Sequence, residues 1–313
     1  MYGVYKGLDM PSFIEVNGFN CRYELNRNLD AKETIIFING IGNPLESWAQ
    51  IKQPLETRYS TMTYDLRGQW FSEVATDKSY SFSTMADDLD QLMEKLDIAN
   101  AHIVGTSLGG EVAQWFALKY PQRVNSLVLV ASVSEANSLM CLMVERWKIV
   151  AENAIAALEA NEGCLQTAYE YSDRFHDVFV PDIFSNKFIT NNAQEIKVRK
   201  QNLRSLIKKT VYEGHVKLSE MFYKLKHEEK LTERLHNITC PTLVIGAEFD
   251  IVKPASFSVL LAEKIPNAKL HIFNDTGHAV LVERPAELTQ LVEDLVISCS
   301  SSKASYNHGC SAA

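Results

Sequence analysis

Short, continuous apolar runs alternate along the chain with segments in which apolar residues recur at helical spacing. Such runs are typical of strands buried on both faces of a sheet, and the spaced segments indicate the helices that cover it. The predicted strands are 34–38, 61–64, 101–104, 126–131, 242–245 and 270–273. The predicted helices are 48–55, 82–96, 111–120, 254–264 and 286–297. This alternation predicts an α/β fold with a mostly parallel sheet.

The first part of the chain departs from this alternation. Segments 13–16 and 21–25 are strand-like and flank Asn17-Gly18. Asn and Gly both tolerate the left-handed backbone that a two-residue hairpin turn requires. We therefore expect a hairpin before the first buried strand.

A long stretch without strand-like runs interrupts the alternation. Within it, 135–160 and 194–212 carry apolar residues at helical spacing, and 169–179 is rich in aromatic residues. A connection of this length is unusual unless it has structure of its own, so it predicts a helical insertion. The expected organisation is an α/β core of 1–133 and 238–299, a helical cap of 134–237, and a disordered Ser- and Ala-rich tail of 300–313.

Composition excludes some classes of function. The 313 residues carry a formal net charge of −8, without a Lys/Arg cluster, which argues against a nucleic-acid-binding surface. The longest apolar runs are too short to span a membrane, and 1–9 lacks the apolar core of a signal peptide. We therefore expect a cytoplasmic protein without a nucleic-acid or membrane partner, and the oligomeric state stays open.

The cysteines give no sign of a metal site or a disulfide framework. The six are Cys21, Cys141, Cys164, Cys240, Cys299 and Cys310, and they form no CxxC pair. No His, Asp, Glu and Cys cluster has the spacing of metal ligands either. The sequence therefore predicts neither a metal nor another cofactor.

The segment 103–110 contains the most specific chemical motif, a Gly-x-Ser-x-Gly turn between a predicted strand and a predicted helix. Glycines at 105 and 109 allow the sharp turn that would expose the hydroxyl of Ser107. The backbone N–H of Leu108 would lie at the positive end of the following helix. Ser107 is therefore the candidate nucleophile.

A serine nucleophile needs a histidine base and a carboxylate that orients it. In this architecture they follow in the order Ser, acid, His, at the carboxyl ends of strands. His278 follows the strand 270–273, and Asp250 follows the strand 242–245. For the acid, Glu248 competes with Asp250 and Glu135 is a weaker rival, while Asp275 suits a solvated loop position. We favour a triad of Ser107, His278 and Asp250.

A tetrahedral intermediate also needs two hydrogen-bond donors for its oxyanion. One is the backbone N–H of Leu108. The second should come from the Gly-rich loop that follows the strand 34–38, where the N–H of Ile41 is the best candidate. We therefore expect Ile41 and Leu108 to form the oxyanion hole.

These features together resemble the α/β-hydrolase superfamily. The resemblance covers 13–298 and is closest to the branch of lactonases, esterases and cofactor-free peroxidases that enol-lactone hydrolases typify. It implies an eight-stranded sheet with a helical cap between strands six and seven. The motifs that carry it are Asn39-Gly40-Ile41-Gly42, Asp65-Leu66-Arg67-Gly68, Gly105-Thr106-Ser107-Leu108-Gly109-Gly110, Gly246-Ala247-Glu248-Phe249-Asp250 and Gly277-His278, with Glu283-Arg284-Pro285 following.

Two positions depart from the family pattern. The family usually has His-Gly where this chain has Asn39-Gly40, and a small residue where this chain has Trp70. The first departure affects the oxyanion loop, and the second narrows or lines the pocket. Residues placed near the site by the sequence, and expected to contact an apolar acyl group, are Trp48, Trp70, Met143 and Trp147.

The resulting hypothesis is a serine hydrolase acting on an ester, thioester or lactone of a small to medium apolar substrate. The acyl group would come from a small molecule or a carrier. Two alternatives stay open, because fold membership does not fix the reaction. One is a non-hydrolytic catalyst, such as a lyase or perhydrolase, and the other is a ligand receptor with slow turnover.

Overall fold

The computed structural model describes residues 11–75 and 80–309, with the backbone alone for 302–309. Its centre is an eight-stranded sheet in the order β1-β2-β4-β3-β5-β6-β7-β8. The first two strands form the predicted hairpin and pair antiparallel, whereas β4 to β8 run parallel with β3. The strands are β1 (Ser12–Val16), β2 (Phe19–Asn26), β3 (Thr34–Ile38), β4 (Ser60–Tyr64), β5 (Ala101–Thr106), β6 (Val124–Val130), β7 (Thr242–Ala247) and β8 (Lys269–Phe273). The predicted α/β fold is thus confirmed.

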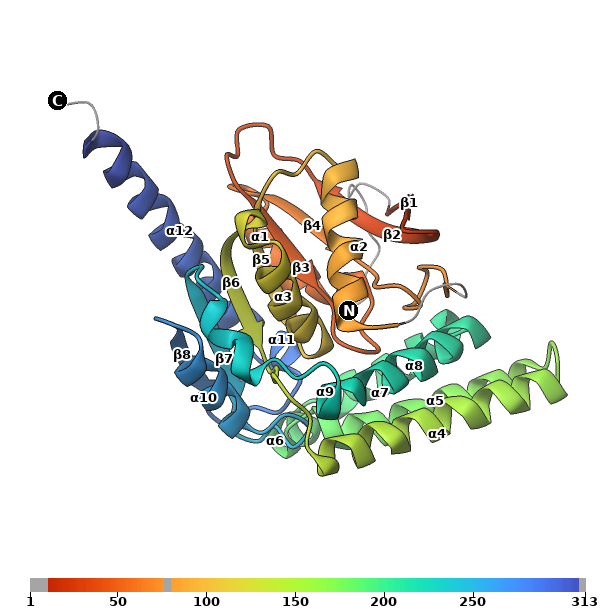
Figure 1. The fold of residues 1–313 in the computed structure, drawn as a ribbon. Coiled ribbons are helices and arrows are strands. Elements are labelled where there is room, and N and C mark those ends of the chain that lie inside the picture. The colour runs from red at the N-terminus through yellow and green to blue at the C-terminus, as the bar shows by residue number, and fades with distance from the viewer. Residues whose placement is uncertain (1–10, 76–79, 310–313) are drawn as a thin grey trace.

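Helices cover both faces of the sheet, which explains why its central strands are apolar throughout. Along β3, Ile36 and Ile38 face one buried cluster, and Ile35 and Phe37 face the other. The first cluster includes side chains of α2 (Phe82–Lys95), α3 (Leu108–Lys119) and α10 (Ala255–Lys264). The second includes side chains of α1 (Ala49–Leu55), α11 (Val280–Glu283) and α12 (Pro285–Gly309). Figure 1 shows α2 and α3 side by side against the sheet.

The long insertion between β6 and β7 is helical, as the sequence predicts. Its helices gather across one end of the sheet, in the green part of Figure 1. Within it, α4 packs against α5 and α8, and α5 also packs against α7. The helices are α4 (Ser138–Ala160), α5 (Leu165–Ile183), α6 (Asn186–Asn191), α7 (Ala193–Leu206), α8 (Lys209–Phe222) and α9 (Lys224–His227), followed by the 3-10 helix Thr232–Asn237. The domain boundaries at 134 and 237 stay a prediction.

The C-terminal segment differs from the prediction. The last helix, expected over 286–297, runs from Pro285 to Gly309 and enters the segment 300–313 that we expected to be disordered. Extending a formed helix adds one backbone hydrogen bond per residue, and within the helix Ser300 Oγ also donates to Glu33 at 2.6 Å. The disordered tail expected over 300–313 stays a prediction. Residues 310–313 and the leading segment 1–9 lie outside the described residues.

None of the helices in the described part of the chain is long and apolar enough to cross a membrane.

Candidate active site

Three strands that end at the same edge of the sheet bring the predicted triad residues together. Ser107 follows β5, Asp250 follows β7 and His278 follows β8. His278 Nε2 lies 2.9 Å from Ser107 Oγ. His278 Nδ1 lies 2.7 Å from Asp250 Oδ2. All three side chains are buried, so the two hydrogen bonds form where water competes little for them.

Ser107 sits at a strained turn. Its φ of 51° and ψ of −122° are uncommon for a residue with a side chain. A Cβ at Gly105 would collide with the carbonyl oxygen of Gly109, so the strand can approach the helix this closely only with glycine there. Such strain persists where the surroundings hold it, and here it presents the Ser107 hydroxyl towards His278.

The rival carboxylates lie elsewhere. Glu248 accepts a hydrogen bond from the backbone of Asp275 at 2.9 Å. Glu135 accepts one from Thr232 at 2.7 Å. Asp275 pairs with Lys187, which holds the pKa of that exposed carboxyl below its ordinary value. The geometry therefore favours Asp250, which bonds the imidazole directly.

A buried ion pair holds the acid loop in place, and the sequence analysis missed it. Asp250 Oδ1 accepts backbone hydrogen bonds from Val252 at 2.9 Å and from Lys253 at 2.7 Å. The ammonium of Lys253 in turn contacts both oxygens of Glu111, at 2.7 and 2.6 Å. Glu111 belongs to α3, the helix that begins next to Ser107. The pair therefore fastens the acid loop to the nucleophile helix.

Burying this ion pair costs desolvation free energy, and the hydrogen bonds that its members make offset part of that cost. Burial lowers the pKa of Lys253, while the Glu111 carboxylate acts in the opposite direction. Glu111 also accepts hydrogen bonds from Ser132 Oγ at 2.7 Å and from the Val133 N–H at 2.9 Å. The sequence shows Glu111 as a charged residue in the otherwise uncharged run 108–118, but it does not show that Lys253 is its partner.

The two predicted oxyanion donors are available. Leu108 is the first residue of α3, where backbone N–H groups have no helical partner. Ile41 lies in the loop after β3 and lines the cavity described below. Within the described residues, neither N–H donates to another protein atom. The positive end of α3 adds to their attraction for an anion.

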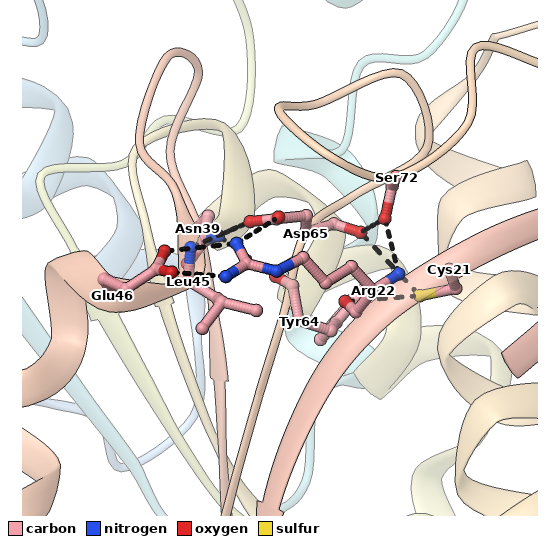
Figure 2. Close-up of polar contacts among 8 residues, drawn as sticks. All are labelled: Cys21, Arg22, Asn39, Leu45, Glu46, Tyr64, Asp65 and Ser72. Carbon is pink, nitrogen blue, oxygen red and sulfur yellow. Dashed lines mark hydrogen bonds and ion pairs between the residues drawn. The ribbon is translucent and has the colours of Figure 1, made fainter. Parts of the chain in front are cut away.

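Asn39 holds the base of the oxyanion loop and does not line the cavity. Its Nδ2 donates to the Tyr64 carbonyl at 3.0 Å, and its Oδ1 accepts from Trp48 Nε1 at 2.8 Å. Figure 2 shows Asn39 beside the Asp65 carboxylate, which accepts from the Leu45 N–H at 2.8 Å. At the position of this departure from His-Gly, the Asn39 side chain ties the start of the loop to β4.

Asp65 is the centre of this supporting network. Arg22 lies between two carboxylates, 3.2 Å from Asp65 Oδ2 and also paired with Glu46 (Figure 2). Burial raises the pKa of Asp65 to about 7, and the Arg22 guanidinium acts in the opposite direction. Because Leu45 and Glu46 begin the turn after the loop, the network fixes the loop at both ends.

Ser107 and His278 open into a cavity of about 250 Å³ between the core and the helical insertion. Of the four residues expected to contact substrate, Trp70 and Trp147 line it. Trp48 does not, because it is fully buried against Phe37 and held by Asn39. Met143 does not line it either and packs, partly buried, against the first of the two hydrophobic clusters. Spacing along a helix could not tell which face would meet the cavity.

Most of the cavity wall was not named in advance. The helices α5 and α7 contribute much of its apolar surface, through Phe175, Phe179, Val180, Ile183, Leu203 and Leu206. Two signals could have found these residues. Segment 169–179 is rich in aromatic residues, and 194–212 carries apolar residues at helical spacing.

In the part of the chain that the structure describes, no group of three or more His, Cys, Asp or Glu side chains could hold a metal ion.

Comparisons with known proteins identify the family. A family model for the alpha/beta hydrolase fold matches residues 33–285. A 2-hydroxy-6-oxononadienedioate/2-hydroxy-6-oxononatrienedioate hydrolase from Cupriavidus pinatubonensis is 29% identical over 271 residues, which cover 84% of this chain and 86% of that protein.

Two solved structures have a similar fold. An alpha/beta hydrolase enzyme from a Medee basin deep-sea metagenome library has a TM-score of 0.79 at 26% identity, over 91% of this chain and 97% of that one. The enol-lactonase from Burkholderia xenovorans has a TM-score of 0.75 at 23% identity, over 91% of this chain and 100% of that one. Because the family model spans most of the chain, this protein is a hydrolase of the alpha/beta hydrolase fold family.

Proposed function

We propose that the protein is a serine hydrolase that cleaves an ester, thioester or lactone of a small to medium apolar substrate. One observation carries the proposal. The imidazole of His278 lies between Ser107 Oγ, at 2.9 Å, and Asp250 Oδ2, at 2.7 Å, beside an apolar cavity. A neutral imidazole held in this way accepts the serine proton, which turns the hydroxyl into a nucleophile.

The proposed reaction proceeds through an acyl-enzyme. Ser107 Oγ attacks the carbonyl carbon while His278 Nε2 takes its proton. The resulting oxyanion accepts hydrogen bonds from the N–H groups of Leu108 and Ile41. His278 then gives the proton to the leaving oxygen or sulfur, and the carbonyl re-forms on Ser107. Water repeats the sequence and releases the acid, with Asp250 orienting the imidazole throughout.

The cavity supports an apolar acyl group. Its volume of about 250 Å³ and its aromatic and aliphatic walls suit a small or medium substrate, free or presented by a carrier. The enol-lactonase of similar fold acts on a lactone by its name, and this is compatible with the same class of bond. The helical insertion acts as a cap that selects the acyl group without taking part in proton transfer.

The test is active-site labelling followed by a substrate panel. A fluorophosphonate probe should modify wild-type protein at Ser107, and p-nitrophenyl esters, thioesters and lactones should turn over. Modification at another serine would refute the assignment. Tight ligand binding with negligible turnover would favour a receptor, and activity that depends on peroxide would favour a perhydrolase.

A further inference from the structure

The loop that carries His278 is fastened to the cap. It joins β8 to α11 and lies against the junction of α5 and α6, at residues 183–185. The Ala279 N–H donates to the Ile183 carbonyl at 2.8 Å. On the solvent side, Lys187 pairs with Asp275 at 2.8 Å. Ala279, which directly follows His278, and Asp275 at the outer edge of the loop therefore both contact the insertion.

Glu283 bridges the two segments. Its Oε1 accepts from the Ser185 N–H at 2.8 Å and from the Gly277 N–H at 3.2 Å. Its Oε2 accepts from the Ser185 hydroxyl at 2.6 Å. Gly277 immediately precedes His278, and Ser185 is the buried N-cap of α6. The Glu283 carboxylate thus binds both the backbone next to His278 and the cap residue Ser185. Because the carboxylate is charged, these hydrogen bonds are stronger than bonds between neutral groups.

The two backbones are in direct contact under this bridge. A Cβ at Gly277 would lie 2.5 Å from the Ser185 nitrogen and 2.8 Å from the Phe184 carbonyl carbon. Nothing larger than glycine fits there, so the loop has no room to shift towards the cap. Its freedom to move away from the cap is limited by the Glu283 bridge.

We propose that Glu283 is a positioning residue that sets His278 by clamping its loop to the α5–α6 junction of the cap. The proposal rests on the proposed function in one respect, namely that His278 is the base whose position matters. The cap then has a second role besides selecting the acyl group, because the base reaches Ser107 only when this junction is docked. At this edge the cap cannot lift without carrying His278 away from Ser107.

The experiment compares Glu283→Ala and Glu283→Gln with Glu287→Ala as the matched control. Glu287 lies one turn further along the same segment and pairs with Arg284 at the surface. The first readout is the proton NMR signal of the hydrogen bond between His278 Nδ1 and Asp250, which resonates far downfield. The second is the rate of fluorophosphonate labelling as a function of pH.

Glu283→Ala should broaden or abolish the downfield signal, slow labelling by at least roughly tenfold, and remove the rise of the rate with pH that a correctly placed base produces. Glu283→Gln keeps an oxygen acceptor for both N–H groups and should stay close to wild type. A folded Glu283→Ala protein with an unchanged signal and an unchanged pH profile would overturn the proposal.

The proposal stays testable if Glu283→Ala does not fold and also if wild-type protein is not labelled. If Glu283→Ala does not fold, Glu283→Asp decides, because its shorter side chain keeps the charge but cannot span Ser185 and Gly277; unchanged readouts there would overturn the proposal equally. If wild-type protein is not labelled at Ser107, the proposed function fails. The downfield signal still supports or refutes the role of Glu283 in that case, because it reports the position of His278 without any turnover.

Discussion

Two serine–histidine–carboxylate arrangements in the described residues differ in whether they have the features of a site. At the carboxyl ends of the strands, His278 links Ser107 and Asp250. Near the opposite ends of β5 and β6, His102 Nδ1 lies 2.7 Å from Ser126 Oγ, and its Nε2 lies 3.5 Å from Glu33 Oε1. The serine–histidine distances are similar, so distance alone does not distinguish them.

The surroundings of the two serine–histidine pairs distinguish them. Ser126 is fully buried within β6 and faces His102 across the strand pair, where backbone N–H groups serve the sheet. Ser107 lies at a strained turn, lines the cavity and is followed by the unpaired N–H of Leu108. A hydrogen-bonded serine and histidine therefore become a candidate site only where the topology adds access for substrate and donors for an oxyanion.

Ser107→Ala tests this difference with the largest expected effect. It should abolish fluorophosphonate labelling and lower turnover by roughly 10⁶, because it removes the hydroxyl that lies 2.9 Å from His278 Nε2. Ser126→Ala is the control and should label at the wild-type rate. A loss of labelling in Ser126→Ala, with Ser107→Ala unaffected, would reverse the assignment.

Asp250→Asn should lower turnover by roughly 10⁴ with the fold intact, since an amide no longer stabilises the imidazolium or its tautomer. Circular dichroism and steady-state kinetics on the same samples measure both quantities. Glu248→Gln is the matched control, because Glu248 binds only the backbone of Asp275. An inactive Glu248→Gln enzyme beside an unaffected Asp250→Asn enzyme would move the acid to Glu248.

Lys253→Met should lower the free energy of unfolding by about 3–5 kcal/mol, because it leaves the fully buried Glu111 carboxylate without its cation. Urea denaturation of the single variant and of Lys253→Met/Glu111→Gln measures this. The double variant should recover part of the loss. Equal stability of wild type and Lys253→Met would show that the pair does not secure the acid loop.

A third buried histidine tests whether burial alone confers a chemical role. His215 lies in the insertion with its ring against the rings of Phe175 and Phe179, and burial lowers its pKa from 6.5 to about 3. The unfolded chain binds a proton there between these values and the folded chain does not. Stability should therefore fall as pH drops below 6.5, by at most about 1.4 kcal/mol per pH unit.

His215→Leu should flatten this part of the pH–stability curve and leave turnover at pH 7 in place. Denaturation at pH 7 and pH 5 measures the slope, with the exposed His227 replaced in the control. If His215→Leu abolished turnover on every substrate while the protein stayed folded, the cap would hold a catalytic group.

The smallest expected effect concerns selectivity. Trp147 lines the cavity, whereas Met143 four residues earlier does not. Trp147→Leu should change the preference between short and long acyl chains by about 1–3 kcal/mol in transition-state binding, with less effect on the best substrate. Met143→Leu should change neither. Ratios of kcat/KM across a p-nitrophenyl ester series measure this, and equal shifts in both variants would contradict the assigned cavity wall.

The sequence could group the candidate triad residues because each of them follows a strand, and parallel strands end at a common edge. Ser107, Asp250 and His278 could therefore be grouped before their distances were known. The supports of these residues could not, because Glu111 and Lys253 are 142 positions apart and neither lies in a motif. The sequence also led us to expect both Trp48 and Trp147 at the substrate. Their packing, which the sequence does not show, leaves Trp147 lining the cavity and Trp48 buried away from it.

The most direct test of the central claim is to trap the acyl-enzyme. Wild-type protein is mixed with an apolar p-nitrophenyl ester, quenched with acid within the first turnovers, digested and mapped by mass spectrometry. The account predicts the acyl mass on the peptide that contains Ser107 and an unmodified peptide for Ser126. Turnover without an acyl group on Ser107, or with the group on another residue, would contradict it.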